Sequence, residues 1–234
     1  MPVYDERGSL AETLRGIRTR AGASLSVSVF LVDDGSEPPI DATSLPPDAA
    51  FFRIVLARHI VNLGQGAALE TARQLALDEP TFDAYVTMDA DGQHSIDDMI
   101  ALASAVNAGA DVALGNRFEG DSNVPRLRRA LLLAARMFER AITGLRLSDA
   151  HNGFRAFGRG ALEHVRIRQN RMAHATEITQ QLSRAPRDGD GLRIVEVPVS
   201  VRYTRESLAR GQSPLGAFAI LRDLFHRYLF EESK

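Results

Sequence analysis

The chain has 234 residues, of which 44% are hydrophobic and 25% charged, ordinary proportions for one soluble globular domain. It contains no cysteine, which excludes both a disulfide framework and a thiolate metal site. No apolar run is long enough for a membrane span, and no basic region followed by an apolar core predicts a secretory signal at the start. We therefore expect a single domain over residues 1–234 and a cytoplasmic location.

The net charge of −2 hides two halves of opposite sign. Residues 1–116 contain 7 Arg against 17 Asp and Glu, a balance of −10. Residues 117–234 contain 20 Arg and one Lys against 13 acidic residues, a balance of +8. An acidic half can hold a cation and a basic half can hold phosphate, although clustering of charges on solvated faces explains the asymmetry equally well.

The first half alternates helix and strand patterns in chain order. Apolar spacing predicts helices at residues 10–20, 66–77 and 95–108, the last with Ser95 as its N-cap. Short runs rich in apolar and β-branched residues predict strands at residues 26–32, 52–57, 83–88 and 111–115. This alternation predicts an α/β fold with a mostly parallel sheet flanked by helices on both faces.

The second half is less regular. Helices are expected at residues 127–145, 160–165, 175–184 and 218–230. Residues 192–203 read as a strand, and Pro198 within it indicates an edge position or a bulge. No strand pattern precedes Pro2, although a doubly wound sheet normally begins with a strand near its centre. We therefore expect a sheet whose first strand is missing, and the hypothesis is that the native protein begins upstream.

Polar clusters follow three of the expected strands: Asp33-Asp34, Asp89 with Asp91, and Asn116-Arg117. In open α/β sheets, ligands bind beyond the carboxyl ends of the strands. Asp89 and Asp91, on alternate residues, could turn toward one cation, and Gln93 adds a neutral oxygen, a set that suits Mg²⁺ or Mn²⁺. Taken alone, these segments are also compatible with turns and helix caps.

Several segments, spread in order along the chain, together resemble the family-2 glycosyltransferases, and especially the synthases that make dolichyl- and polyprenyl-phosphate sugars. These segments are Pro2–Glu6, Val32–Ser36, Asn62–Gly66, Asp89–His94, Gly115–Phe118, Asp149–Phe157, Glu177, Glu196–Val199 and Gly211–Ser213. The resemblance implies the Rossmann-like GT-A fold, with residues 1–116 binding nucleotide sugar and metal and residues 117–234 binding the acceptor.

The resemblance also implies roles for individual residues. The donor, a GDP- or UDP-sugar, would be bound by Pro2, Tyr4, Glu6, Asp33, Asp34, Gly64, Gly66 and Asp89. The metal ligands would be Asp89, Asp91 and Gln93. Arg117, Arg129 and Arg202 would contact an acceptor phosphate, for which arginine is well suited. The catalytic set would be Asp91, Asp89, Arg117 and Asp149.

The acceptor decides whether the reaction needs a base. Many relatives that glycosylate a hydroxyl carry a Glu-Asp pair near Asp149, and this sequence lacks it. That absence and the arginines favour inverting transfer to a polyprenyl phosphate, which needs no base, while Asp149 stays a candidate base. The alternatives are transfer to a sugar hydroxyl in polysaccharide or lipid-linked glycan synthesis, and a non-catalytic partner subunit.

A lipid acceptor implies contact with the inner face of the cell membrane, directly or through a membrane partner protein. The expected helices at residues 127–145 and 218–230 combine basic and apolar faces, as interfacial helices do, although packing on the sheet explains either one better when it is taken alone. No nucleic-acid partner is expected.

Overall fold

A computed structural model describes residues 1–6, 8–79, 82–119, 147–149, 152–170, 173–185 and 191–202. The expected helices at 127–145 and 218–230, together with Arg129, lie outside these residues. No helix in the described ranges is both long and apolar enough to cross a membrane. The elements run in the order β1 (Pro2–Val3), α1 (Leu10–Arg20), β2 (Val27–Asp33), η1 (Ala42–Ser44), β3 (Phe52–Arg58), α2 (Gln65–Asp78), β4 (Tyr85–Thr87), α3 (Ile96–Asn107), β5 (Val112–Asn116), β6 (Arg155–Phe157), α5 (Arg159–His164), α6 (Ala173–Arg184) and β7 (Ile194–Pro198).

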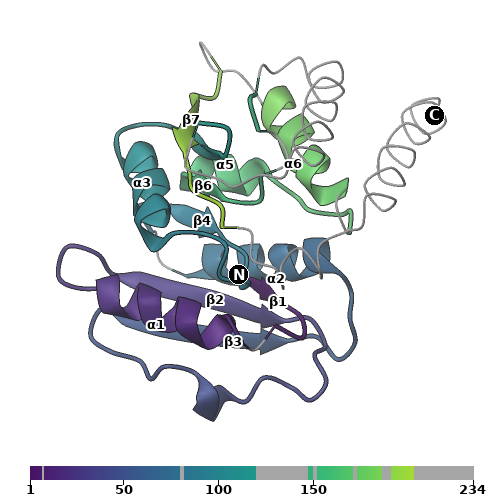
Figure 1. Cartoon of the computed structure of the whole chain (residues 1–234). Coiled ribbons are helices and arrows are strands. Elements are labelled where there is room, and N and C mark those ends of the chain that lie inside the picture. The colour runs from purple at the N-terminus through teal and green to yellow at the C-terminus, as the bar shows by residue number, and fades with distance from the viewer. Residues whose placement is uncertain are drawn as a thin grey trace, which may run out of the picture.

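The expected α/β fold is confirmed, but the strands form two sheets instead of one. The first has the order β1-β2-β3 and is entirely parallel. The second has the order β4-β6-β5-β7, in which β6 is antiparallel to both of its neighbours and β7 is parallel to β5. Figure 1 shows the purple and blue strands of the first sheet below the teal and green strands of the second. β7 ends at Pro198 on the sheet edge, as the proline predicts.

Helices cover both faces of the first sheet, and the alternation along β2 explains how. Val29 and Leu31 belong to one buried cluster, which includes Leu14 and Ile17 of α1. Phe30 and Val32 point the other way, into a second cluster that contains residues of α2, α5 and α6. A strand buried on both faces carries a continuous apolar run, which is why Val29–Val32 has no polar alternation.

Two strands were not expected from the sequence. β1 contains only two residues, and β6 contains three. β6 lies antiparallel between β4 and β5, where the sequence predicted parallel neighbours. β4 is equally short but lies in a longer apolar run that predicted it, whereas β1 and β6 lie in no such run, so only their pairing reveals them.

Candidate active site

Three segments that follow strands meet at one end of the second sheet. They are residues 89–94 after β4, Asn116 and Arg117 at the end of β5, and residues 199–202 after β7. The amide of Val199 donates to the carbonyl of Asn116 at 3.1 Å, and the amide of Arg202 donates to the carbonyl of Gln93 at 3.0 Å. Residues 199–202 therefore hold residues 89–93, the acidic motif, next to Asn116 and Arg117. The sequence alone predicted only that both segments follow strands.

Asp89 and Asp91 form the acidic part of the site. Burial works to raise the pKa of Asp89, but the nearby His94 and His174 and the chain's amino group outweigh it and hold that pKa below its usual value. Burial raises the pKa of Asp91, and the charges of Asp89 and Glu6 raise it further, against the amide of Gln93. The negative charges of Asp89 and Glu6 disfavour a third negative charge on Asp91, which is one reason for its raised pKa. A bound cation would reduce this repulsion between carboxylates.

The donor atoms near Asp91 fit a hard divalent cation that a substrate helps to hold. Within the described ranges, no three His, Cys, Asp or Glu side chains form a ready-made cage. Mg²⁺ is commonly held by only one or two carboxylates plus substrate phosphates, and an all-oxygen set of this kind also suits Mn²⁺. Asp89 and Asp91, with Gln93 beside them, match that pattern, and their roles as metal ligands stay a prediction.

Residues near the N-terminus border the acidic part. A carboxylate oxygen of Glu6 accepts a hydrogen bond from the hydroxyl of Ser9, which also donates to the carbonyl of Ala90, each at 2.9 Å. Glu6 therefore lies close to the acidic motif, while Pro2 is buried in β1 and Tyr4 is 52% exposed. The expected roles of Pro2, Tyr4 and Glu6 in donor binding stay predictions.

Asp33 and Asp34 are buried and order the loops around the site. Asp33 accepts hydrogen bonds from the amides of Ser36 and Ile40 at 2.9 and 3.1 Å. Burial works to raise its pKa, but the Ser36 side chain, these two amides and the charge of Arg58 outweigh that effect and leave the pKa below its usual value. Asp34 accepts from the amides of Leu63 and Gly64 at 3.0 and 2.8 Å. Both carboxylates shape loops, and contact with a nucleotide stays a prediction for each.

Asp34 also contacts His59, which the sequence did not single out. Its Oδ1 lies 2.7 Å from Nδ1 of His59, and Nε2 of the same ring lies 2.9 Å from the hydroxyl of Thr71 on α2. The histidine therefore links the end of the first sheet to α2. A lone histidine after a strand carries no local pattern from which this link could be predicted.

Gly64 and Gly66 allow a loop to approach the start of α2. Gly64 has φ +98°, a conformation that strongly favours glycine, and a Cβ at Gly66 would lie 2.0 Å from the carbonyl oxygen of Gln169. The side chain of Asn170 accepts a hydrogen bond from the amide of Ala67 at 3.0 Å. The glycines thus admit residues 169–170, and a donor contact there stays a prediction.

Between these glycines, Gln65 reaches the acidic motif. Its side-chain amide donates to Oδ1 of Asp89 at 2.9 Å. The sequence placed Gln65 in a matching segment but assigned it no role. A polar side chain between two glycines at a helix start is the signal that could have pointed to it.

Arg117 and Asp149 form a buried ion pair. Oδ2 of Asp149 accepts from Nε of Arg117 at 2.6 Å and from the amide of Arg117 at 3.0 Å. The side chain of Asn152 lies 3.3 Å from the same oxygen and donates to the carbonyl of Gly115 at 3.0 Å. Asp149 therefore positions Arg117 and the end of β5, a role that the sequence did not predict, and its role as a base stays a prediction. Arg202, by contrast, is exposed beside Gln93.

Comparisons with known proteins identify relatives of this chain. The chain is 29% identical to an uncharacterized protein, MJ1222, of Methanocaldococcus jannaschii, over 98% of this chain and 91% of that one. It is 30% identical to the polyprenol monophosphomannose synthase of Mycolicibacterium smegmatis (70% and 62%) and 28% identical to the dolichol-phosphate mannosyltransferase of Pyrococcus furiosus (97% and 61%). The chain thus spans about three fifths of the length of these two synthases.

Solved structures share the fold. Glucosyl-3-phosphoglycerate synthase from Mycobacterium tuberculosis, crystallised with Mn²⁺, UDP and phosphoglyceric acid, superposes with a TM-score of 0.61 at 18% identity, over 94% of this chain and 75% of that one. This likeness shows the GT-A-like fold. The family described as Glycosyl transferase family 2 matches residues 1–166, which is more than half of the chain. The protein therefore belongs to glycosyl transferase family 2.

Proposed function

We propose that this protein transfers a sugar from a GDP- or UDP-sugar to a polyprenyl phosphate, with inversion at the anomeric carbon. The observation that carries the proposal is the position of residues 199–202. Their backbone bonds to Gln93 on one side and to Asn116 on the other, and so holds the acidic motif and the arginines at one site. The synthases of M. smegmatis and P. furiosus, named for polyprenol and dolichol phosphate, support a lipid phosphate acceptor.

On the donor side, Asp89, Asp91 and Gln93 would hold a divalent cation, Mg²⁺ or Mn²⁺. The cation supplies positive charge for the departing nucleoside diphosphate. Gln65 holds one oxygen of Asp89 through the 2.9 Å hydrogen bond. The amide of Gln93 holds Oδ1 of Asp91 at 3.0 Å. Fixed carboxylates need little rearrangement as charge develops, which is the electrostatic benefit of such a site.

On the acceptor side, the buried pair of Arg117 and Asp149 argues for a phosphate nucleophile. Asp149 is 4% exposed and accepts two hydrogen bonds from Arg117, so it is poorly placed to take a proton from a hydroxyl. A phosphate monoester is already anionic near neutral pH and needs positioning more than a base. The guanidinium of Arg202, which is exposed beside the acidic motif, is the positively charged group that such a phosphate would contact.

A lipid acceptor places the working enzyme at a membrane surface. Large apolar side chains are exposed at Tyr4 (52%) and in the loop after β3, at Ile60 (92%), Val61 (59%) and Leu63 (48%). The amide of Leu63 bonds to Asp34, so this loop borders the donor side of the site. Exposed apolar residues gathered near a site are typical of membrane or partner contact, and they support a peripheral membrane location.

The test measures release of GDP or UDP from a panel of nucleotide sugars, with and without polyprenyl phosphate and added Mg²⁺ or Mn²⁺. We expect turnover that needs both the metal and the lipid phosphate. Asp91→Asn should lower turnover by about 100-fold or more, because charge on the leaving group is then poorly stabilised. The matched control is Asp83→Asn, an exposed aspartate just before β4, which should keep normal turnover.

Circular dichroism melting of both variants shows whether the fold is retained. Metal-dependent turnover retained by a folded Asp91→Asn variant would contradict the proposed metal site. Turnover with a lipid-linked sugar in place of polyprenyl phosphate would assign a hydroxyl acceptor instead. Absence of turnover with every donor and acceptor would point to a non-catalytic partner subunit.

A further inference from the structure

Ser9 stands at the N-cap position of α1 but does not cap the helix. Its backbone has φ −87° and ψ −25°, which are helical values, and its side chain makes no capping hydrogen bond. A capping serine normally has extended backbone angles and accepts a hydrogen bond from an amide of the first helical turn. The hydroxyl of Ser9 therefore does not serve the start of α1.

The hydroxyl of Ser9 instead contacts the acidic motif, 81 positions further along the chain. It lies 2.9 Å from the carbonyl oxygen of Ala90 and 2.9 Å from Oε1 of Glu6. A hydroxyl has a single hydrogen, so it donates to one of these two oxygens at a time. Ser9 thus links Glu6 to the peptide that joins Ala90 to Asp91.

Ala90 is held both by its side chain and by its carbonyl. The side chain is 4% exposed and belongs to the same buried cluster as Leu10, the first residue of α1. Its two neighbours, Asp89 and Asp91, are only partly buried. Because a peptide unit is planar, a hydrogen bond to the carbonyl of Ala90 also fixes the amide of Asp91. The contact with Ser9 therefore orders the backbone between the two carboxylates.

The turn after Asp91 also packs on Ser9. Gly92 has φ +72°, and a Cβ built there would lie 3.2 Å from the Cβ of Ser9. The amide of Gln93 then donates to Oδ1 of Asp91 at 3.0 Å, which closes the turn. Ser9 therefore lies against the residues on both sides of Asp91.

A neutral donor suits this place better than a charged one. Asp89, Asp91 and Glu6 gather negative charge here, and the charges of Asp89 and Glu6 help to raise the pKa of Asp91. A lysine or arginine would neutralise the acidic motif and compete with a cation for it. The hydroxyl of Ser9 can order the backbone and still leave the charge of the carboxylates to a ligand.

We propose that Ser9 is a positioning residue for Asp91 as a metal ligand. Its hydroxyl fixes the peptide between Ala90 and Asp91 and so holds the Asp91 carboxylate in the orientation that a divalent cation requires. The same hydroxyl keeps Glu6 beside the acidic motif, where its negative charge adds to the attraction for the cation. This role rests on the proposed function for the identity of the ligand, and on the contacts of Ser9 for the rest.

Hydrogen exchange in the metal-free protein tests the positioning directly. Ser9→Ala should speed exchange of the Gln93 amide by roughly fivefold, the effect of losing about one hydrogen bond. The backbone of Ser9 is helical and no cap is lost, so the melting temperature should fall by only about 2–4 °C. The control is Thr19→Ala, which removes an exposed hydroxyl bonded to the carbonyl of Arg15 on the same helix and should leave exchange at Gln93 unchanged.

Two further substitutions separate positioning from helix capping. Ser9→Thr keeps the hydroxyl, whereas Ser9→Gly removes it but costs little at an N-cap. If the hydroxyl positions the acidic motif, Ser9→Thr should keep slow exchange and Ser9→Gly should match Ser9→Ala. If Ser9 were only a cap, Ser9→Gly should behave like the unaltered chain, and that result would overturn the proposal.

Mn²⁺ binding in the presence of UDP or GDP, followed by electron paramagnetic resonance, tests the consequence for the metal. Ser9→Ala and Ser9→Gly should bind Mn²⁺ about 10-fold more weakly than the unaltered chain, as expected when a group that orients a metal ligand is removed. Ser9→Thr and Thr19→Ala should bind it normally. Unchanged Mn²⁺ affinity, or unchanged exchange at Gln93, in a folded Ser9→Ala variant would overturn the proposal.

Failure of the proposed function would give a different result. If the unaltered chain bound no Mn²⁺ with either nucleotide, the proposed function would be contradicted, and with it the metal role of Ser9. The exchange measurements contain neither metal nor nucleotide, so they would still show whether Ser9 orders the acidic motif.

Discussion

At the residue scale, the end of β5 depends on one oxygen atom of Asp149. That oxygen accepts two hydrogen bonds from Arg117 and lies within reach of Asn152, while both members of the ion pair are almost fully buried. Removing one partner of a buried pair leaves the other charge without compensation, which costs more than an exposed pair contributes. The pair therefore positions Arg117 and also contributes to stability.

We expect Asp149→Ala to destabilise the protein by about 3–5 kcal/mol, because the guanidinium of Arg117 loses its buried counter-charge. The control is Glu163→Ala, which breaks the exposed pair with Arg159 on α5 and should change stability much less, because exposed ion pairs contribute little. Urea unfolding curves of both variants measure the difference. Equal midpoints for the two would show that the buried pair contributes no more than a surface pair.

At the element scale, the N-terminus of α2 packs against the loop at residues 166–170. Glu177 of α6 accepts hydrogen bonds from the amides of Arg168 and Gln169, each at 2.9 Å. Glu70 of α2 accepts one from the amide of Ile167 at 3.0 Å. Two helices thus hold the loop that closes over Gly66, and the backbone of this loop leaves no room for a side chain there.

Gly66→Ala should therefore destabilise the protein by about 1–3 kcal/mol, the usual cost of overpacking, since its Cβ would meet the carbonyl of Gln169. Gly160→Ala is the matched control within α5, where a Cβ would meet nothing within 4 Å. That change should be neutral or stabilise by up to about 1 kcal/mol. Thermal melting compares the two, and a stable Gly66→Ala variant would mean that the loop moves away at little cost.

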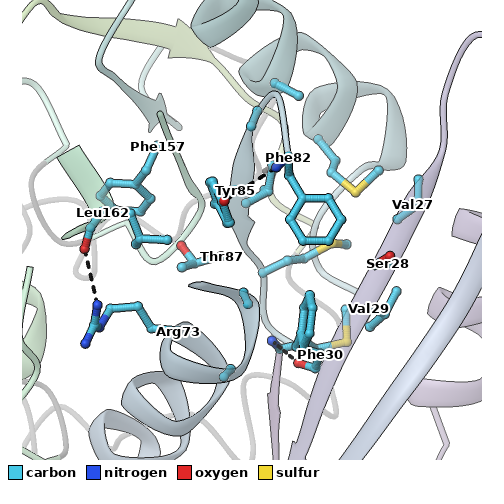
Figure 2. A pocket seen from close by; sticks show the side chains of 18 of the residues that line it. Val27, Ser28, Val29, Phe30, Arg73, Phe82, Tyr85, Thr87, Phe157 and Leu162 are labelled. Carbon is cyan, nitrogen blue, oxygen red and sulfur yellow. Dashed lines mark hydrogen bonds between the residues drawn. The ribbon is translucent and has the colours of Figure 1, made fainter. Parts of the chain in front are cut away.

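At the scale of the whole molecule, the two sheets meet around an apolar cavity lined by Val27, Val29, Phe30 and Tyr85 (Figure 2), and the amine of Met1 lies buried beside it. The unfolded amine has a pKa of 8.0, and the folded one has a pKa of about 5. Between these values the unfolded chain holds more protons than the folded chain. As pH falls from about 8 to about 5, protonation of the amine in the unfolded chain therefore lowers the free energy of unfolding. Below about pH 5 the amine is protonated in both states and adds no further pH dependence.

Acetylation of the Met1 amine should remove this pH dependence, because an amide keeps the N–H donor but cannot be protonated. We expect the unmodified chain to lose up to about 1.4 kcal/mol per pH unit within this window relative to the acetylated chain. Urea unfolding of both forms at several pH values measures the difference and cancels the contributions of the carboxylates and histidines. Parallel stability profiles would show that the amine is not buried in solution.

Much of the fold follows from patterns that are local in the sequence. The helix at Leu10–Arg20 was predicted with both ends, and Ser95 caps α3 by accepting from the amide of Asp97. The strands β2, β3 and β5 were predicted to within about a residue at each end. Helical periodicity and runs of apolar and β-branched residues reflect burial that every neighbour in the segment shares. The acidic motif was recognisable for a similar reason, since alternate carboxylates after a buried strand form a local pattern.

Tertiary structure alone decided what depends on pairing between distant segments. β6 lies between β4 and β5, Asp149 holds Arg117, Gln65 holds Asp89, and β2 and β4 line the same apolar cavity. Each of these depends on residues more than twenty positions apart, whose contact no local periodicity encodes. The sequence by itself determined the family, the helices, the longer strands and the acidic motif. Only the packed chain decided how the strands pair and which charges become buried together, because burial energy depends on neighbours that folding brings into contact.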